Sequence, residues 1–276
     1  MRKYWESIYS PNYISGYNPF LLKNMNKAIK KLAYAINNRK KIVIYGVSTV
    51  DGICSISSLS LLLNYLNADT EYLIHENKEG ANTITEQDIR EEVDFLGADL
   101  LITLGLDFES KEVLDLCRNL NIDVMVFETR KTDAEPDYDY VNPNQKGCQY
   151  RFKNISLSIL TFKLMQAVAI YYNMKSINKY LDLILLGTKC ERVEEKGENL
   201  VILKEGKKYL SNTNNIGICA IVDLAGKKDI NEEYIIGQIT PSDNTVGVVN
   251  NAKIIVELLT TNDRDRAEQI VKYLYK

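Results

Sequence analysis

In the first half of the chain, short apolar segments alternate with stretches whose apolar residues recur every three or four positions. Apolar runs of about four to eight residues predict buried strands, and the longer spacing predicts amphipathic helices. Chains that alternate strands with helices in this way form parallel sheets with helices on both faces. We therefore predict an α/β fold with a doubly wound, mostly parallel sheet.

The predicted elements change in kind near the middle of the chain. Strands are expected at 41–45, 70–74, 98–106 and 122–128, and helices at 20–37, 52–66, 84–96 and 110–120. After Pro143 only helices are expected, at 155–172, 176–186, 200–209, 216–224, 250–260 and 262–274. We expect residues 1–147 to form a parallel-sheet core with an N-terminal helical arm. Residues 148–276 are expected to form a helical subdomain that completes the domain.

Composition excludes several classes of protein. The net charge of −3 and the pI of about 5.5 give no sign of a generally basic, nucleic-acid-binding or membrane-surface protein. The five cysteines are scattered without a C-x-x-C pair, which favours reduced intracellular thiols over disulfides or a zinc site. No apolar run reaches about 18 residues and no signal peptide opens the chain. We expect a cytoplasmic protein that does not bind membranes.

Acidic residues follow several of the predicted strands and one predicted helix. They lie in the loops 46–52, 103–110, 127–133 and 185–199, and they are Asp51, Asp107, Glu128 and Glu191. If the loops converge, these carboxylates are suitable ligands for Mg²⁺ or Mn²⁺. Asp51 and Asp107 also stand where helix N-caps are expected, so capping is the simpler alternative for each. The single histidine, His75, is expected at a strand end and not as a ligand.

Several segments resemble the motifs of a known family in the same order along the chain. "IVIYGVSTVDGICS" is similar to I-Y-G-D-Y-D-x-D-G-x-x-S, and "GADLLITLGLDF" to D-L-x-I-T-V-D-x-G-I. "IDVMVFETR" is similar to I-D-V-I-V-T-D-H-H, and "LDLILLGTKCERVEEKGEN" to L-D-L-V-A-L-G-T-x-A-D-V-V-P-L-x-G-E-N. These motifs are typical of the DHH phosphoesterases, in the branch of the RecJ single-strand-specific DNA exonucleases. The resemblance extends from about residue 14 to residue 274 and implies the DHH fold.

The resemblance also implies a metal site, but the ligands have changed. Family members hold two divalent ions, Mn²⁺ or Mg²⁺, which activate water and neutralise the phosphodiester. The positions of the family's metal ligands and their motif neighbours fall on Val47, Thr49, Asp51, Gly105, Glu128, Thr129, Arg130 and Glu191. Only three of these are carboxylates, and Arg130 brings a positive charge. We therefore expect two-metal nuclease activity to be lost and no cofactor to be bound.

Phosphate-binding positions have changed as well. The family's R-x-N-A-A-G-R segment falls on 242–248, where both arginines are absent and Asn244 and Gly247 remain. Arg130 and Lys189 are further candidates for contact with an anion. The family's S-G-x-G segment becomes "SLSI" at 156–159, so side chains fill a place of close backbone approach. The family continues past this chain's last residue into a second domain and an OB-fold. The sequence is compatible both with a core-only protein and with a piece of a longer one.

Three functional hypotheses follow from this resemblance. The first is an inactive module that binds a replication or repair protein, a single strand or a nucleotide, as the inactive RecJ-like subunit of the eukaryotic replicative helicase does in its own complex. The second is a residual phosphoesterase with one metal on Asp51, Glu128 and Glu191, with Asp107 as a further ligand. The third is a sensor of a small anion in the former cleft. The aromatic N-terminal segment 4–17 suits a partner surface, or it pins the arm to the core.

Overall fold

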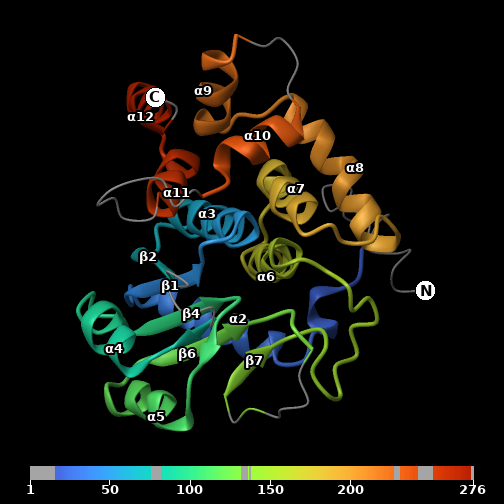
Figure 1. The fold of residues 1–276 in the computed structure, drawn as a ribbon. Coiled ribbons are helices and arrows are strands. Elements are labelled where there is room, and N and C mark those ends of the chain that lie inside the picture. Colours follow the sequence, from blue (N-terminus) through green and yellow to red (C-terminus); the bar gives the residue numbers. More distant parts are fainter. Residues whose placement is uncertain are drawn as a thin grey trace.

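The computed structural model describes residues 16–75, 82–131, 136, 138–226, 231–241 and 251–274. A parallel sheet lies between two groups of helices, with α4 and α5 on one face and α3 and α6 on the other (Figure 1). The remaining helices of the second half gather beyond α3 and α6, on the side away from the sheet (Figure 1). The predicted α/β architecture with a helical second part is confirmed.

The main sheet has five strands in the order β2-β1-β4-β6-β7, and every neighbouring pair is parallel. Its strands are β1 (Ile42–Val47), β2 (Thr70–His75), β4 (Leu100–Leu104), β6 (Asp123–Phe127) and β7 (Asp139–Val141). All residues of β1 and β4 are buried, as expected for central strands that are covered on both faces. A separate pair joins β3 (Thr83–Ile84) to β5 (Asp107–Phe108).

The helices of the first half largely match the prediction. They are η1 (Pro19–Leu21), α2 (Met25–Asn37), α3 (Val50–Tyr65), α4 (Glu86–Asp88), the π-helical turn η2 (Ile89–Val93) and α5 (Lys111–Asn119). The expected helix at 84–96 is thus a short α-helix followed by a π-turn. It begins with a capping box in which Thr85 and Asp88 satisfy each other's backbone N–H groups.

The second half is helical where the structure describes it. Its elements are α6 (Leu157–Tyr171), η3 (Asn178–Tyr180), α7 (Leu181–Cys190), α8 (Gly197–Ser211), α9 (Ile216–Leu224), α10 (Glu232–Ile239), α11 (Ala252–Thr260) and α12 (Arg264–Leu274). Helix α10 was not predicted, and neither were the short strands β3, β5 and β7.

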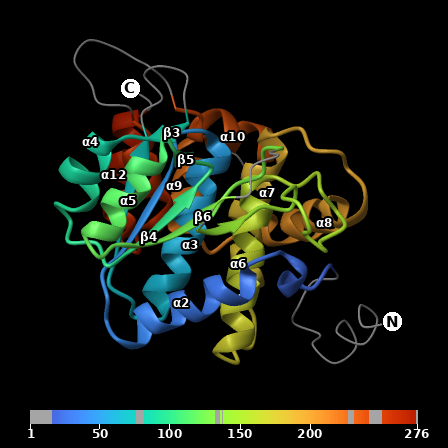
Figure 2. The same ribbon diagram turned by 90° about the horizontal axis from the view of Figure 1, so that it is seen from below.

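Helix α3 joins the two parts into one core. It packs against β1 on one side and against α6, α7 and α11 on the others, so almost all of its residues are buried. Helices α3 and α6 run side by side from the carboxyl edge of the sheet (Figure 2). The boundary at 147/148 stays a prediction. None of the helices within the described residues is both long and apolar enough to span a membrane.

Candidate active site at the carboxyl edge of the sheet

The carboxyl ends of β1, β4 and β6 bring three of the acid-bearing loops to one edge of the sheet. In open α/β sheets this is the edge at which ligands bind. Gly105 follows β4 and lies against Val47 at the end of β1, while Glu128 and Arg130 follow β6. The fourth loop joins them from the helical part, because the charge of Glu191 acts on Asp51.

Asp51 is buried and its carboxylate binds the first turn of α6. Its Oδ2 accepts a hydrogen bond from the Leu157 N–H at 2.7 Å, and its Oδ1 accepts one from the Ser158 N–H at 2.8 Å. The Ser158 hydroxyl donates to the same Oδ1. Gly187 permits this contact, since a Cβ there would lie 2.9 Å from Oδ1. Both carboxylate oxygens therefore satisfy the free N–H groups of a helix terminus.

The expectation that Asp51 caps its own helix is wrong. Thr49 is the N-cap of α3, and its Oγ1 accepts a hydrogen bond from the Gly52 N–H at 3.1 Å. Asp51 lies one turn further in and reaches across to α6, a helix more than a hundred residues later in the chain. Burial is the main cause that raises the pKa of Asp51 to about 6, with Glu191 adding to the rise and the hydrogen bonds from Ser158 opposing it.

Val47, Gly105 and Leu157 form an apolar contact where the resemblance places two metal ligands and a glycine. A Cβ on residue 105 would lie 3.0 Å from Leu157 Cδ2 and 3.3 Å from Val47 Cγ2. Gly105 also has a φ of +74°, a conformation that strains residues with a side chain. Val47 and Leu157 are both almost fully buried. An acidic side chain at 105 would therefore meet hydrocarbon and not a cation.

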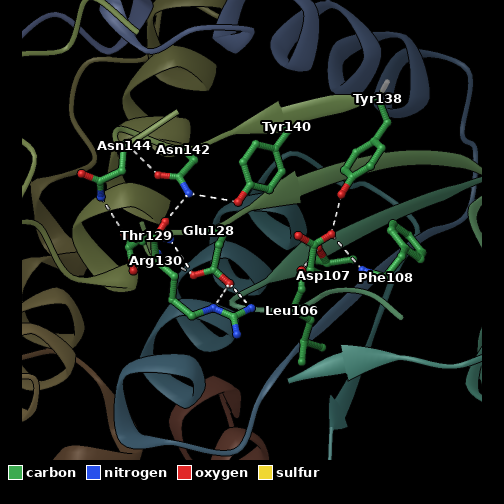
Figure 3. Close-up of polar contacts among 11 residues, drawn as sticks. Leu106, Asp107, Phe108, Glu128, Thr129, Arg130, Tyr138, Tyr140, Asn142 and Asn144 are labelled. Carbon is green, nitrogen blue, oxygen red and sulfur yellow. Dashed lines mark hydrogen bonds and ion pairs between the residues drawn. The ribbon is translucent and has the colours of Figure 1, made fainter. Parts of the chain in front are cut away.

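Glu128 is buried and its carboxylate is fully occupied by its own loop. Oε1 accepts the N–H groups of Thr129 and Arg130 at 2.7 and 2.9 Å. Oε2 accepts Arg130 Nε at 2.7 Å and lies 2.6 Å from Arg130 Nη2 (Figure 3). Burial alone would lower the pKa of Arg130, but the ion pair with Glu128 outweighs it and raises that pKa. The Arg130 guanidinium therefore supplies the positive charge that pairs with the Glu128 carboxylate.

Two asparagines that were not predicted hold this loop in place. Asn142 donates to the Arg130 carbonyl at 2.8 Å and to the Tyr140 hydroxyl at 3.0 Å. Asn144 donates to the Thr129 carbonyl at 2.7 Å, and its N–H donates to Asn142 Oδ1 at 2.7 Å (Figure 3). Both belong to the "NPN" segment directly after β7, and this run of turn-forming residues was the available signal.

Asp107 is a strand residue and not the helix cap that was expected. It belongs to β5, and the N-cap of α5 is Ser110. Its Oδ1 accepts hydrogen bonds from the Tyr138 hydroxyl and, at 2.8 Å, from the Phe108 N–H (Figure 3). The Asp107 charge adds to the stabilisation of the Arg130 cation, so the two side chains share one neighbourhood.

The remaining candidates lie at the ends of α7 and β2 or outside the described residues. Glu191 is exposed at the end of α7, and Lys189 Nζ pairs with Glu195 Oε1 at 2.8 Å. His75 ends β2, as expected, with its ring 5.9 Å from that of Tyr45. Asn244, Gly247 and the N-terminal aromatic residues up to Tyr13 lie outside the described residues.

The donor set does not fit a pair of divalent cations. Such cations need several free carboxylate or imidazole groups. Asp51 is committed to α6, Glu128 to Arg130 and its loop, and the positions at 47 and 105 are apolar. No cluster of three or more histidine, cysteine, aspartate or glutamate side chains within the described part of the chain could hold a metal.

Known proteins resemble this chain in both sequence and fold. RecJ of Bacillus subtilis, a single-stranded-DNA-specific exonuclease, is 31% identical over 259 residues, which are 92% of this chain and 32% of that protein. The Haemophilus influenzae RecJ is 26% identical over 92% of this chain and 46% of its own length. The chain thus spans less than half of either relative.

Solved structures agree with these matches. The Mn²⁺ complex of Thermus thermophilus RecJ has a TM-score of 0.74 at 21% identity, covering 92% of this chain and 37% of that one. A manganese-bound exonuclease RecJ has a TM-score of 0.78 at 21% identity, covering 92% of this chain and 65% of that one. At this identity the structures establish the fold alone. The family model for the DHH family N-terminal domain matches residues 41–188. The chain therefore belongs to the DHH family.

Proposed function

We propose that this protein is a RecJ-like DHH module of DNA replication or repair that has lost two-metal nuclease activity and acts by binding. Its ligand is a single strand, a nucleotide or a protein of that machinery, and it works in the cytoplasm. The single observation that carries the proposal is the apolar contact of Val47, Gly105 and Leu157 at the positions where the family has two acids and a glycine.

The changes at these three positions support one another. A leucine at 157 fills space that a side chain on residue 105 would need, and glycine at 105 leaves that space open. Val47 completes the contact from β1. Drift at one position would leave a cavity or a clash, whereas this set packs closely. Such packing is expected of a fold that is maintained after the metal site has been lost.

The charges at the edge favour binding over hydrolysis. Nε and Nη2 of Arg130 pair with the Glu128 carboxylate, but 52% of the Arg130 side chain remains exposed. An exposed guanidinium is a good partner for phosphate, and it repels Mn²⁺ or Mg²⁺. We therefore assign Arg130 to contact with the anionic backbone of a ligand. This binding needs no metal ion or other cofactor.

A cleavage assay tests the proposal. The protein is incubated with 5′-labelled single-stranded DNA and, separately, with a chromogenic phosphodiester, with Mn²⁺ or Mg²⁺ present. The Bacillus subtilis RecJ serves as the active control. We expect no turnover above a metal-free blank, and binding of the labelled strand that weakens with added salt. Metal-dependent turnover that Asp51→Ala abolishes would show a residual one-metal phosphoesterase instead.

A further inference from the structure

A pocket lies away from the carboxyl edge of the sheet, at the opposite ends of α3 and α7. Its volume is about 570 Å³, within the range of about 300–1,000 Å³ that is typical of small-molecule sites. Residues of α3, α7, α8, α9 and α11 line it. The last four of these helices lie on the side of α3 away from the sheet (Figure 1). Leu61 and Asp51 lie ten residues apart on α3, which corresponds to about 15 Å.

The polar wall of this pocket is held rigidly. Asp182 is buried, its Oδ1 accepts the Leu183 N–H at 2.7 Å, and its Oδ2 accepts the Thr213 hydroxyl at 2.6 Å. Asn215 caps α9 and also donates to the Leu259 carbonyl at 2.8 Å. The segment between α8 and α9 is therefore tied to both α7 and α11, which preorganises the pocket wall.

Several polar groups of the same wall are left available. Asn214 sits between Thr213 and Asn215 but is exposed, and its amide has no hydrogen-bond partner among the described residues. The same is true of the exposed Asn262, which follows α11. Tyr209 is half-buried, and its hydroxyl likewise lacks a described partner. Each amide offers one donor face and one acceptor face to a ligand.

One cation at this pocket is not neutralised. Lys179 Nζ lies 4.8 Å from the ring centroid of Tyr65 and 4.9 Å from that of Tyr180, and it makes no ion pair within the described residues. Lys208, in contrast, pairs with Glu205 at 2.7 Å. A ligand thus meets one accessible positive charge, free amides and a tyrosine, together with apolar side chains such as Leu61.

We propose that this pocket binds a nucleotide, either free or at the end of a single strand. Asparagine amides pair with the donor and acceptor edge of adenine, and tyrosine rings pack against bases. The ammonium of Lys179 supplies the charge for a phosphate. A purely apolar ligand would leave these polar groups without partners, and a strongly basic ligand would meet Lys179. A nucleotide provides all three complementary groups: a base edge for the asparagine amides, a base ring for Tyr209 and a phosphate for Lys179.

Isothermal titration calorimetry on the full chain tests this site with AMP, with adenosine and with a 5′-phosphorylated adenine oligonucleotide. The double variant Asn214→Ala, Asn262→Ala is expected to weaken AMP binding about tenfold, the loss of one or two hydrogen bonds. Lys179→Met is expected to weaken AMP but to leave adenosine unchanged. Asn119→Ala and Lys30→Ala, exposed on α5 and α2, are the matched controls.

The outcomes separate the two sources of the ligand. Binding of AMP alone assigns the pocket to free nucleotides, and tighter binding of the oligonucleotide assigns it to a strand end. The proposal is overturned if none of the three probes binds at millimolar concentration, or if the Asn214→Ala, Asn262→Ala double variant and Lys179→Met both bind AMP like the parent chain. Cleavage plays no part in this measurement, so its failure would leave the proposed loss of nuclease activity untouched.

Discussion

Substitution of Gly105 by alanine tests how closely the protein is packed at the position where the family resemblance places a metal ligand. The change forces a side chain into a conformation with φ of +74°, which costs about 1–2 kcal/mol for an L-residue. The added Cβ would also lie 3.0 Å from Leu157 Cδ2, and overpacking of this kind costs about 1–3 kcal/mol. Together we expect the free energy of unfolding to fall by about 2–5 kcal/mol.

Gly97 provides a matched control for the backbone contribution. Its φ is +70°, and a Cβ there would have nothing within 4 Å. Gly97→Ala should therefore cost only the strain of about 1–2 kcal/mol. The difference between the two alanine variants measures the steric contact at 105.

A double-mutant cycle with Leu157→Ala identifies the partner in that contact. Shortening Leu157 removes the Cδ2 atom, so the double variant should be less destabilised than the sum of the single ones by about 1 kcal/mol. Urea unfolding followed by circular dichroism supplies the four free energies. Equal losses at 105 and 97, together with additive effects of the 105 and 157 changes, would refute the close packing.

Three further predictions concern the acids and the loop beside them. Burial and the Glu191 charge raise the pKa of Asp51 to about 6, against about 3.9 in an unfolded chain, so the folded state holds this proton more tightly. The protonated Asp51 side chain therefore stabilises the folded state most below about pH 4. This contribution declines by up to about 3 kcal/mol as the pH rises through 6. Urea unfolding should detect the decline in the parent chain but not in Asp51→Asn. Asn142→Ala should lower the free energy of unfolding by about 2–4 kcal/mol, because it leaves the Arg130 carbonyl and the Tyr140 hydroxyl without this donor. Asn119→Ala, at an exposed position, should change stability little. Equal losses in the two variants would contradict the role of Asn142. Arg130→Ala should cost only about 1 kcal/mol because the arginine is half exposed, and a loss as large as that of Asn142→Ala would contradict this.

The sequence predicted the sheet and most helices because their signals are local. The strands β1 and β4 are continuous apolar runs, and α9 was predicted at its observed bounds. The strands β3, β5 and β7, which were not predicted, have only two or three residues each and are too short for a periodicity to show. Helix α10 carries a local signal that the prediction did not use, the N-cap Asn231 followed by Glu232 and Glu233 in the first turn.

The site was predicted in its residues but less well in their contacts. Motif comparison identified Val47, Gly105 and Arg130 as changed positions, and the structure explains how they pack. It did not reveal that Asp51 binds the N-terminus of α6, because that contact joins residues far apart in the chain. Pairing of Glu128 with Arg130, two residues away, depends on a turn whose geometry is fixed by Asn142 and Asn144.

The most direct test of the proposed loss of the metal site is titration of the purified protein with Mn²⁺ in a calorimeter. The Bacillus subtilis RecJ is measured alongside as the positive control. We predict no saturable Mn²⁺ binding by this chain, because the carboxylates of Asp51 and Glu128 are occupied by N–H groups and by a guanidinium, which leaves Glu191 without a second free ligand from these motifs. Saturable binding that Asp51→Ala and Glu128→Gln both abolish would contradict the account.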